Sequence, residues 1–307
     1  MSAMGRRVRG FWRVYRRSRQ GLLGVAILGV FALIAIAGPE LVGQPDRAGT
    51  FRQFLPPSGE HPFGTDRAGR DLFTINVHGA RISMLVGLVA SAITMLIGSA
   101  VGIVAGFLGG RVDTALMRIT DFFYVLPTLV LAIVLAAILG PSLFNVIVVI
   151  GLASWPGTAR IIRAQTLSIR ERMFVYRARA YGASNARLML RHVLPNVFGL
   201  VLANATLTVA YAIFLETTLS FLGVGPKDSF SWGRILEESF AAGALTLGMW
   251  AWFVPPGLSV VLVVLAFTLI GAAFDEILDP RLRVRSVGVG DELPVSETGA
   301  VVAATRA

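Results

Sequence analysis

Residues that could carry enzyme chemistry are few and scattered in this sequence. The chain has no cysteine, which excludes disulfides, thiolate metal sites and cysteine nucleophiles. Its three histidines, His61, His78 and His192, are too far apart in sequence to suggest a set of metal ligands. Neither a G-x-S-x-G nor an H-E-x-x-H pattern occurs. The sequence therefore predicts no catalytic residues and no metal site, which argues against a membrane enzyme.

The single lysine excludes a nucleotide site of the common kind. A P-loop needs the order Gly-Lys-Ser/Thr so that an ammonium group reaches the terminal phosphates of ATP. Lys227 lies instead between Pro226 and Asp228. We therefore expect no ATPase activity and no cofactor in this chain.

The composition is that of a membrane protein. Hydrophobic residues make up 55% of the chain and charged residues only 15%, and the mean hydropathy is +0.70. The formal net charge of +10 comes almost wholly from arginine. The elements that position any functional residue must therefore be helices long enough to cross a bilayer, about 20 apolar residues each.

Runs without Asp, Glu, Lys or Arg predict six such helices, and we expect an all-α membrane protein. Two overlong runs need a break: Gly140-Pro141-Ser142 is a turn signal in one, and Pro255-Pro256-Gly257 kinks or starts a helix in the other. The expected spans lie in residues 21–39, 82–110, 122–159 (two helices), 193–215 and 239–274.

Arginine placement orients the bundle. With a cytoplasmic N-terminus, most basic residues fall on the inner side, as positive residues do in membrane proteins. Both termini are then cytoplasmic. The resulting organisation is a basic N-terminal segment, a first helix, an external loop, a five-helix core and a disordered tail, at residues 1–20, 21–40, 41–81, 82–285 and 286–307. A cleaved signal peptide ending near Ala35-Ile36-Ala37 is an alternative for the first helix.

The stretch RARAYGASNARLMLRHVLPN, which starts at Arg177, interrupts the apolar chain with a basic segment. Phe174, Ala178 and Tyr181 share one face of a short helix. Gly182 can end that helix in the left-handed conformation, and Ser184 can cap the next one. Pro195 suits the first turn of the fifth span. We call residues 170–192 the bent segment.

Two readings of the bent segment stay open on these patterns. It could project from the membrane and move as one piece with the adjacent spans, or it could lie on the membrane surface as arginine-rich amphipathic helices do. Nucleic-acid binding is disfavoured because the arginines are already explained by orientation.

A stripe of small residues marks the second span. Gly98, Gly102, Gly106 and Gly110 recur every four residues, on one helix face. Such a stripe allows close approach of another helix backbone.

Several ordered motifs resemble those of a known family. The stretch YGASNARLMLRHVLPN resembles the EAA loop of bacterial ABC-importer permeases, with Gly182, Leu194 and Pro195 at motif positions. The chain is similar to the C-type permease of dipeptide and oligopeptide importers. The further stretches that carry the likeness are HPFGTDRAGRDLFTINVHGARISMLVG, ETTLSFLGVG, SWGRIL and FDEILDPRLR. The motif of the family opens Glu-Ala-Ala, whereas this chain has Tyr176, Arg177 and Ala178.

The resemblance implies a type I ABC-importer permease fold in which the bent segment is a coupling helix seated on a separate ATPase. The residues implied in ATPase coupling are Tyr176, Arg177, Ala178, Tyr181, Gly182, Ala183, Ser184, Leu194 and Pro195. ATP and Mg would be bound by two ATPase subunits. A B-type permease would complete a heterodimer in the bacterial inner membrane, surrounded by lipid, and an extracytoplasmic binding protein would deliver a peptide. Nickel and glutathione are carried by relatives of this type.

Polar residues in the fifth span are candidates for the substrate pathway. Asn204, Thr208 and Tyr211 share a face that would suit a passing peptide backbone, and Glu216 lies near the outer surface, where it could meet a ligand amino group or Arg234. Hydrogen bonds between helices are the alternative role. Near the inner end of the third span, Asp121 is expected to pair with an arginine.

External segments 40–81 and 223–250 are rich in Pro, Gly and mixed charge, and we expect the binding protein to dock there. An ion-coupled transporter or channel acting without an ATPase is the alternative function. It usually needs ionisable residues deep in the bundle. The second span and the 122–159 hairpin contain none.

Overall fold

The computed structural model describes Tyr15 and residues 18–45 and 49–278 of the 307-residue chain. Within these residues the structure is helical, and the only β-type pairing is a bridge between Thr65 and Asp71. The expected N-terminal segment lies largely outside the described residues, and the expected tail lies wholly outside them.

The helices, in chain order, are α2 (Arg19–Val42), α3 (Leu72–Leu108), α4 (Gly110–Val125), α5 (Thr128–Leu139), α6 (Leu143–Arg170), α7 (Met173–Ala180), α8 (Asn185–Leu188), the π-helix η1 (Met189–Val193), α9 (Leu194–Phe221), α10 (Trp232–Ala241) and α11 (Trp250–Leu278). Five are long and apolar enough to cross a membrane: α2, α3, α6, α11 and the continuous rod of α8, η1 and α9. The pair α4 and α5 makes a sixth if it is counted as one broken span.

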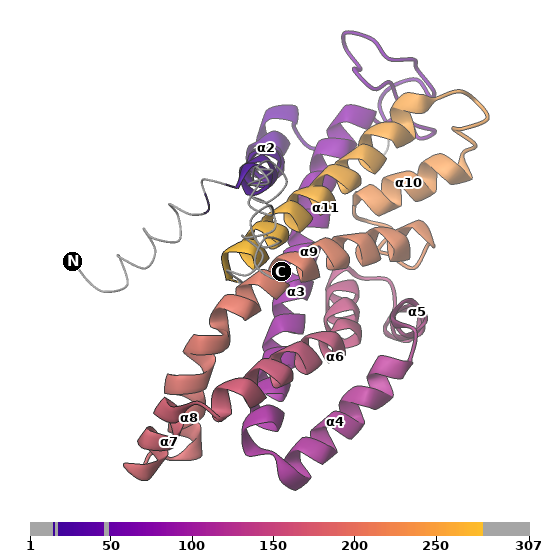
Figure 1. Ribbon diagram of the computed structural model, residues 1–307. Helices are drawn as coiled ribbons and strands as arrows, with labels where there is room; N and C mark the ends of the chain where they lie inside the picture. The colour runs from indigo at the N-terminus through magenta and orange to yellow at the C-terminus, as the bar shows by residue number, and fades with distance from the viewer. Residues whose placement is uncertain (1–14, 16–17, 46–48, 279–307) are drawn as a thin grey trace, which may run out of the picture.

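The bundle is organised around α3, which packs most extensively against α6 and also contacts α2 and α9. Helix α11 lies against α2 and α9. Figure 1 shows α7 and α8 at one end of the molecule, whereas α10 and the loop between α2 and α3 lie at the other end. We call these the bent-segment end and the loop end.

Three glycines let α3 and α6 pack backbone to backbone. A Cβ atom added to Gly98, Gly102 or Gly106 would come within 2.6–2.8 Å of atoms of α6, among them the carbonyl oxygens of Ala159 and Arg163. Gly110, the fourth member of the expected stripe, does not take part: it begins α4 with φ +55°, and an added Cβ would contact nothing within 4 Å. The glycine face therefore holds three residues, and it serves helix packing as expected.

Helix α3 begins ten residues earlier than the charge-free run that predicted it. Asp71 caps the helix, because its Oδ1 accepts a hydrogen bond from the backbone N–H of Thr74 at 2.7 Å. The run was cut at Arg81, whose side chain is exposed on the helix surface and does not interrupt it. The loop between α2 and α3 is correspondingly shorter than the expected 41–81.

The third span, expected as a single helix from residue 122, is divided into two helices and begins earlier, at Gly110. Helix α4 ends at Val125, and α5 starts at Thr128 after a bend of 89°. Leu126 is extended (φ −70°, ψ 129°) because the ring of Pro127 disfavours the helical conformation in the residue before it. Proline also lacks the N–H that would continue the helix.

The second half of the hairpin follows the prediction at its start but not at its end. Gly140 has φ +86°, and Ser142 caps α6 by accepting from the N–H of Asn145 at 3.1 Å, which confirms the turn. Helix α6 then continues to Arg170, beyond the expected end at Ala159. One of its arginines binds α4 tightly: Arg163 donates to Asp113 through two contacts of 2.6 Å.

The last overlong run divides in front of its prolines. Helix α10 ends at Ala241 and α11 begins at Trp250, so Pro255 and Pro256 lie in the second turn of α11. The prolines are thus near the start of the last helix, as expected.

Candidate coupling segment and substrate pathway

The bent segment has the predicted helix–glycine–helix form. Helix α7 ends in a Schellman motif, in which the N–H of Gly182 bonds to the carbonyl of Arg179 at 2.9 Å and that of Ala183 to Ala178 at 3.1 Å. Gly182 has φ +81°, and Ser184 caps α8 by accepting from the N–H of Arg187 at 3.4 Å. The bend is therefore fixed by local hydrogen bonds.

One face of the segment is anchored to the bundle. Val175 and Leu188 are fully buried in a cluster with residues of α3, α6, η1 and the start of α9: Ile103, Phe107, Ile162, Ile169, Val193 and Val197. Ala178, Ala183 and Leu194 pack against the same cluster. A force applied to the bent segment is thus passed to three long helices.

The opposite face is open. Tyr181 is 91% exposed and Phe174 41% exposed, so most of the apolar face expected from the sequence points away from the bundle. Val175, not Phe174, is the anchor on α7. Exposed aromatic side chains on a fixed helix are suited to contact with another protein.

A carboxylate lies beside the position where the resembled motif has glutamate. The hydroxyl of Tyr176 donates to Oε2 of Glu171 at 2.6 Å, and Arg170 donates to Oε1 at 3.1 Å. The hydrogen bond from Tyr176, with that from Arg170, holds the pKa of Glu171 below its usual range. The same bond to Glu171 raises the pKa of Tyr176. Glu171 therefore presents a stable negative charge next to the motif.

The helical rod continues through the proline that was expected to open the fifth span. Pro195 is in the first turn of α9, but α9 follows η1 without a break. The N–H of Leu194 reaches back to the carbonyl of Met189, the five-residue spacing of a π-turn. The wider turn brings the bent segment and α9 into one continuous element.

Asn204 and Thr208 join three helices. The amide of Asn204 donates to Thr158 Oγ1 of α6 at 3.1 Å and to Met95 Sδ of α3 at 3.5 Å. Thr208 donates to the carbonyl of Asn204 at 2.8 Å within α9, and its Oγ1 also contacts Met95 Sδ of α3 at 3.7 Å. Tyr211 lies on the same helix face, and its side chain is exposed. The geometry thus includes the helix-to-helix hydrogen bonds that were the alternative reading for this face.

Glu216 differs from the expectation. Its side chain is only 1% exposed, and it accepts hydrogen bonds from Ser220 Oγ at 2.8 Å and Ser83 Oγ at 3.2 Å. Arg234 pairs instead with Glu237 and Glu238. Glu216 therefore joins α9 to α3 in this structure and is not open to a ligand. Its burial could not be read from the sequence, because it depends on the packing of α9 against α3, which supplies Ser83.

The expected partner for Asp121 is present. Arg160 of α6 donates to Asp121 Oδ1 at 2.9 Å and lies over the ring of Tyr124. Within the described residues no group of His, Asp and Glu could hold a metal ion.

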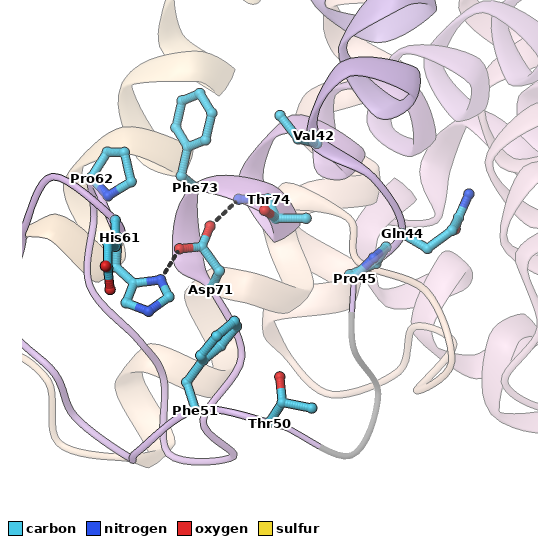
Figure 2. Close-up of a pocket in the computed structure, with 11 residues that line it drawn as sticks. Val42, Gln44, Pro45, Thr50, Phe51, His61, Pro62, Asp71, Phe73 and Thr74 are labelled. Atoms are coloured by element: carbon cyan, nitrogen blue, oxygen red, sulfur yellow. Dashed lines mark hydrogen bonds and ion pairs between the residues drawn. The ribbon is translucent and has the colours of Figure 1, made fainter.

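The loop end carries pockets formed by the loop between α2 and α3. One of about 480 Å³ is shown in Figure 2, where His61 Nδ1 lies 2.8 Å from Asp71 Oδ2. It also includes Phe51 and Phe73. An apolar pocket of about 500 Å³ lies between the loop and the start of α11, lined among others by Phe54, Pro56, Phe63, Met249 and Trp250.

The chain is thus a helical bundle with spans of membrane-crossing length and a fixed, exposed bend at one end. Residues 98–284 match the family described as "binding-protein-dependent transport system inner membrane component". The chain belongs to this family. Membership implies a multi-pass protein of the bacterial inner membrane, working with a second permease, ATPase subunits and a substrate-binding protein.

Relatives match over nearly the whole chain. The dipeptide transport system permease protein DppC of Bacillus subtilis (strain 168) is 39% identical over 274 residues, 89% of this chain and 85% of the relative. The oligopeptide transport system permease protein OppC of the same organism is 36% identical, over 88% of each chain. A putative peptide transport system permease protein of Brucella suis is 39% identical, over 87% of this chain and 90% of the relative.

The fold is also found in a solved structure. A chain of the MetNI methionine ABC transporter, described in inward facing conformations, matches with a TM-score of 0.53 and 22% identity, over 69% of this chain and 96% of the other. This likeness supports the permease fold.

Proposed function

We propose that this chain is a permease subunit of an ATP-driven importer and forms half of the pathway for dipeptides or oligopeptides. The single observation that carries the proposal is the two-sided bent segment. One face, at Val175 and Leu188, is locked to the long helices, and the other presents Tyr181 to a partner. Contact with an ATPase at Tyr181 would move the bundle without any chemistry in this chain.

The remaining roles follow from that assignment. The bent-segment end is cytoplasmic, with both termini on that side, and the loop end is external. A B-type permease completes the heterodimer. The binding protein docks at the loop end, where the pockets of the α2–α3 loop lie. Peptides are favoured as substrates because relatives that match 88–89% of this chain bear peptide-transport names.

On the pathway, we propose that Thr208 and Tyr211 face the permeating peptide, whereas Asn204 fixes the crossing of α9 with α6. A neutral hydrogen-bonding face can exchange contacts with a peptide backbone without holding it tightly. Glu216 contributes by holding α9 in place.

The proposal predicts uptake that depends on partner subunits. Reconstituted with the B-type permease, both ATPases and the binding protein, the chain should support uptake of a labelled dipeptide or oligopeptide that stops when ATP or the binding protein is omitted. The measurement is radiolabel retained in proteoliposomes. Uptake driven by an ion gradient from this chain alone would establish the ion-coupled alternative. Uptake of nickel or glutathione in place of peptide would overturn the substrate class only.

A cysteine series tests orientation and contacts, because the chain has no native cysteine. Tyr181→Cys carrying a short thiol-specific photocrosslinker is expected to link to an ATPase subunit in the assembled importer. Lys227→Cys, exposed at the loop end, is the matched control and should link to no ATPase. Mass spectrometry of the crosslinked bands identifies the partner.

In the same series, Tyr211→Cys should react with a water-soluble maleimide, and substrate peptide should slow that reaction. A Tyr181 crosslink to no ATPase, or labelling of Lys227→Cys only from the cytoplasmic side, contradicts the orientation. A reaction at Tyr211→Cys that peptide never slows contradicts the pathway.

A further inference from the structure

A buried carboxylate shapes the last turn of the α2–α3 loop. Asp66 is fully buried. Its Oδ1 accepts the backbone N–H groups of Ala68 and Arg70, both at 2.8 Å, and its Oδ2 accepts from the Arg70 side chain. The backbone and the guanidinium of Arg70 are therefore held by the same carboxylate. Such multiple hydrogen bonds to one charged group fix a side chain in a single direction.

Arg70 points across to α10. Its Nη2 donates to Glu238 Oε2 at 2.6 Å, a contact between residues 168 positions apart. The second oxygen of Glu238 is 3.0 Å from Arg234, which also pairs with Glu237. Burial alone lowers the pKa of Arg70, but Glu238 and Asp66 together raise it above its ordinary value. We call Asp66, Arg70, Glu238 and Arg234 the clasp.

Helix α10 is fixed to the bundle on its other side. Trp232 is buried, its backbone N–H donates to Ser83 Oγ at 3.1 Å, and its indole N–H donates to the carbonyl of Asn76 at 3.2 Å. Both acceptors belong to α3. The clasp therefore ties a loop to a helix that cannot itself move freely.

The clasp also encloses a space. A pocket of about 390 Å³ lies between the loop and α10, lined among others by Ala68, Arg70, Glu237, Ala241 and Trp252. On the neighbouring side, the ring of Phe54 in the loop lies 6.3 Å from the ring of Trp252 in α11. Among the described residues, the clasp alone joins the loop to α10 by charge.

We propose that Arg70 is a positioning residue whose clasp makes residues 49–71 and α10 one rigid docking surface for the binding protein. This rests on the proposed function for the identity of the partner. A preformed surface does not have to be ordered on binding, so it binds at lower partner concentration. The clasp therefore determines the binding-protein concentration that gives half-maximal uptake. The maximal uptake rate is determined by the rest of the bundle.

The test compares two adjacent carboxylates in the assembled importer. Glu238→Ala removes the contacts of this carboxylate with Arg70 and with Arg234, whereas Glu237→Ala removes a contact of Arg234 alone. In Glu238→Ala, amide hydrogen exchange of residues 49–71 should be faster by about tenfold, since a hydrogen bond to a charged group is lost. Exchange in α6 should be unchanged, and Glu237→Ala should resemble the parent. Loop exchange that is equal in Glu238→Ala and the parent overturns the proposal.

The functional readout separates positioning from general damage. In Glu238→Ala, the binding-protein concentration for half-maximal uptake should rise about tenfold with little change in maximal rate. In that background, cysteines at Ala68 and Ala241, which line the same pocket, can be joined by a bis-maleimide. The tether should restore the parental half-maximal concentration.

Three results are decisive. If the maximal rate falls and the half-maximal concentration stays, or if the tether restores nothing, Arg70 does not act by positioning. If uptake needs no binding protein at all, the proposed function fails, while the exchange experiment still decides whether the clasp holds the loop.

Discussion

Gly182→Val is expected to reduce ATP-driven uptake by at least about tenfold without reducing the amount of folded chain. Gly182 has φ +81°, a conformation that costs a residue with a Cβ about 1–2 kcal/mol, and more when the side chain is branched at Cβ. An added Cβ would meet no atom within 4 Å, so the cost comes from the backbone and not from crowding. Relief of that strain changes the angle between α7 and α8. Every 1.4 kcal/mol of free energy corresponds to about a tenfold change in the underlying equilibrium constant.

The matched control is Gly182→Asn, because asparagine adopts the left-handed region far more readily than valine. It should retain most of the uptake. Uptake and binding-protein-stimulated ATP hydrolysis are measured on the same proteoliposomes, and the valine variant should hydrolyse ATP without moving peptide. Parental transport by the valine variant would show that the angle of the bend does not matter for coupling.

Gly102→Leu is expected to prevent the bundle from packing, with a loss of stability of about 3 kcal/mol or more. A Cβ at this position would lie 2.6 Å from the carbonyl oxygen of Ala159 and 2.9 Å from the backbone nitrogen of Arg163. Both are backbone atoms of α6, so the clash is relieved only if α3 and α6 separate. The measurement is thermal unfolding and size-exclusion behaviour in detergent.

Gly29→Leu controls for added apolar volume in a membrane helix. Gly29 lies on the exposed surface of α2, and a Cβ there would contact nothing within 4 Å. Its unfolding curve should match that of the parent, and Gly102→Ala should fall between parent and Gly102→Leu. Equal stability of the two leucine variants would mean that the α3–α6 contact is not as close as the structure has it.

The long helices could be predicted because each is a continuous apolar run, but their ends could not. A scan that stops at charged residues starts α3 only after Arg81 and ends α6 before Arg160. A long arginine side chain can, however, extend from a helix surface without interrupting the backbone. Pro127 was the available signal for the break between α4 and α5. It lies inside an uninterrupted apolar run, so hydrophobicity alone does not reveal it.

Local chemistry also explains which parts of the candidate site could be predicted. Gly182 and Ser184 act on their neighbours in sequence, so the bend follows from residue types alone. The surroundings of Glu216 and the contact of Arg70 with Glu238 depend on how distant elements are brought together. Arg70, Ser83 and Glu216 stand in stretches that resemble the family, but no local pattern shows which distant residues they touch.

The contact between Arg70 and Glu238 has a consequence for biosynthesis. At about 5–20 residues per second, the 168 residues from Asp71 to Glu238 take a ribosome roughly 10–30 s to add. During that interval the loop has left the ribosome without its partner helix, and four later spans must still enter the bilayer. The α2–α3 loop is therefore synthesised early but gains its contact with α10 late. In a chain that stops before residue 238, Arg70 has its contact with Asp66 but lacks the one with Glu238.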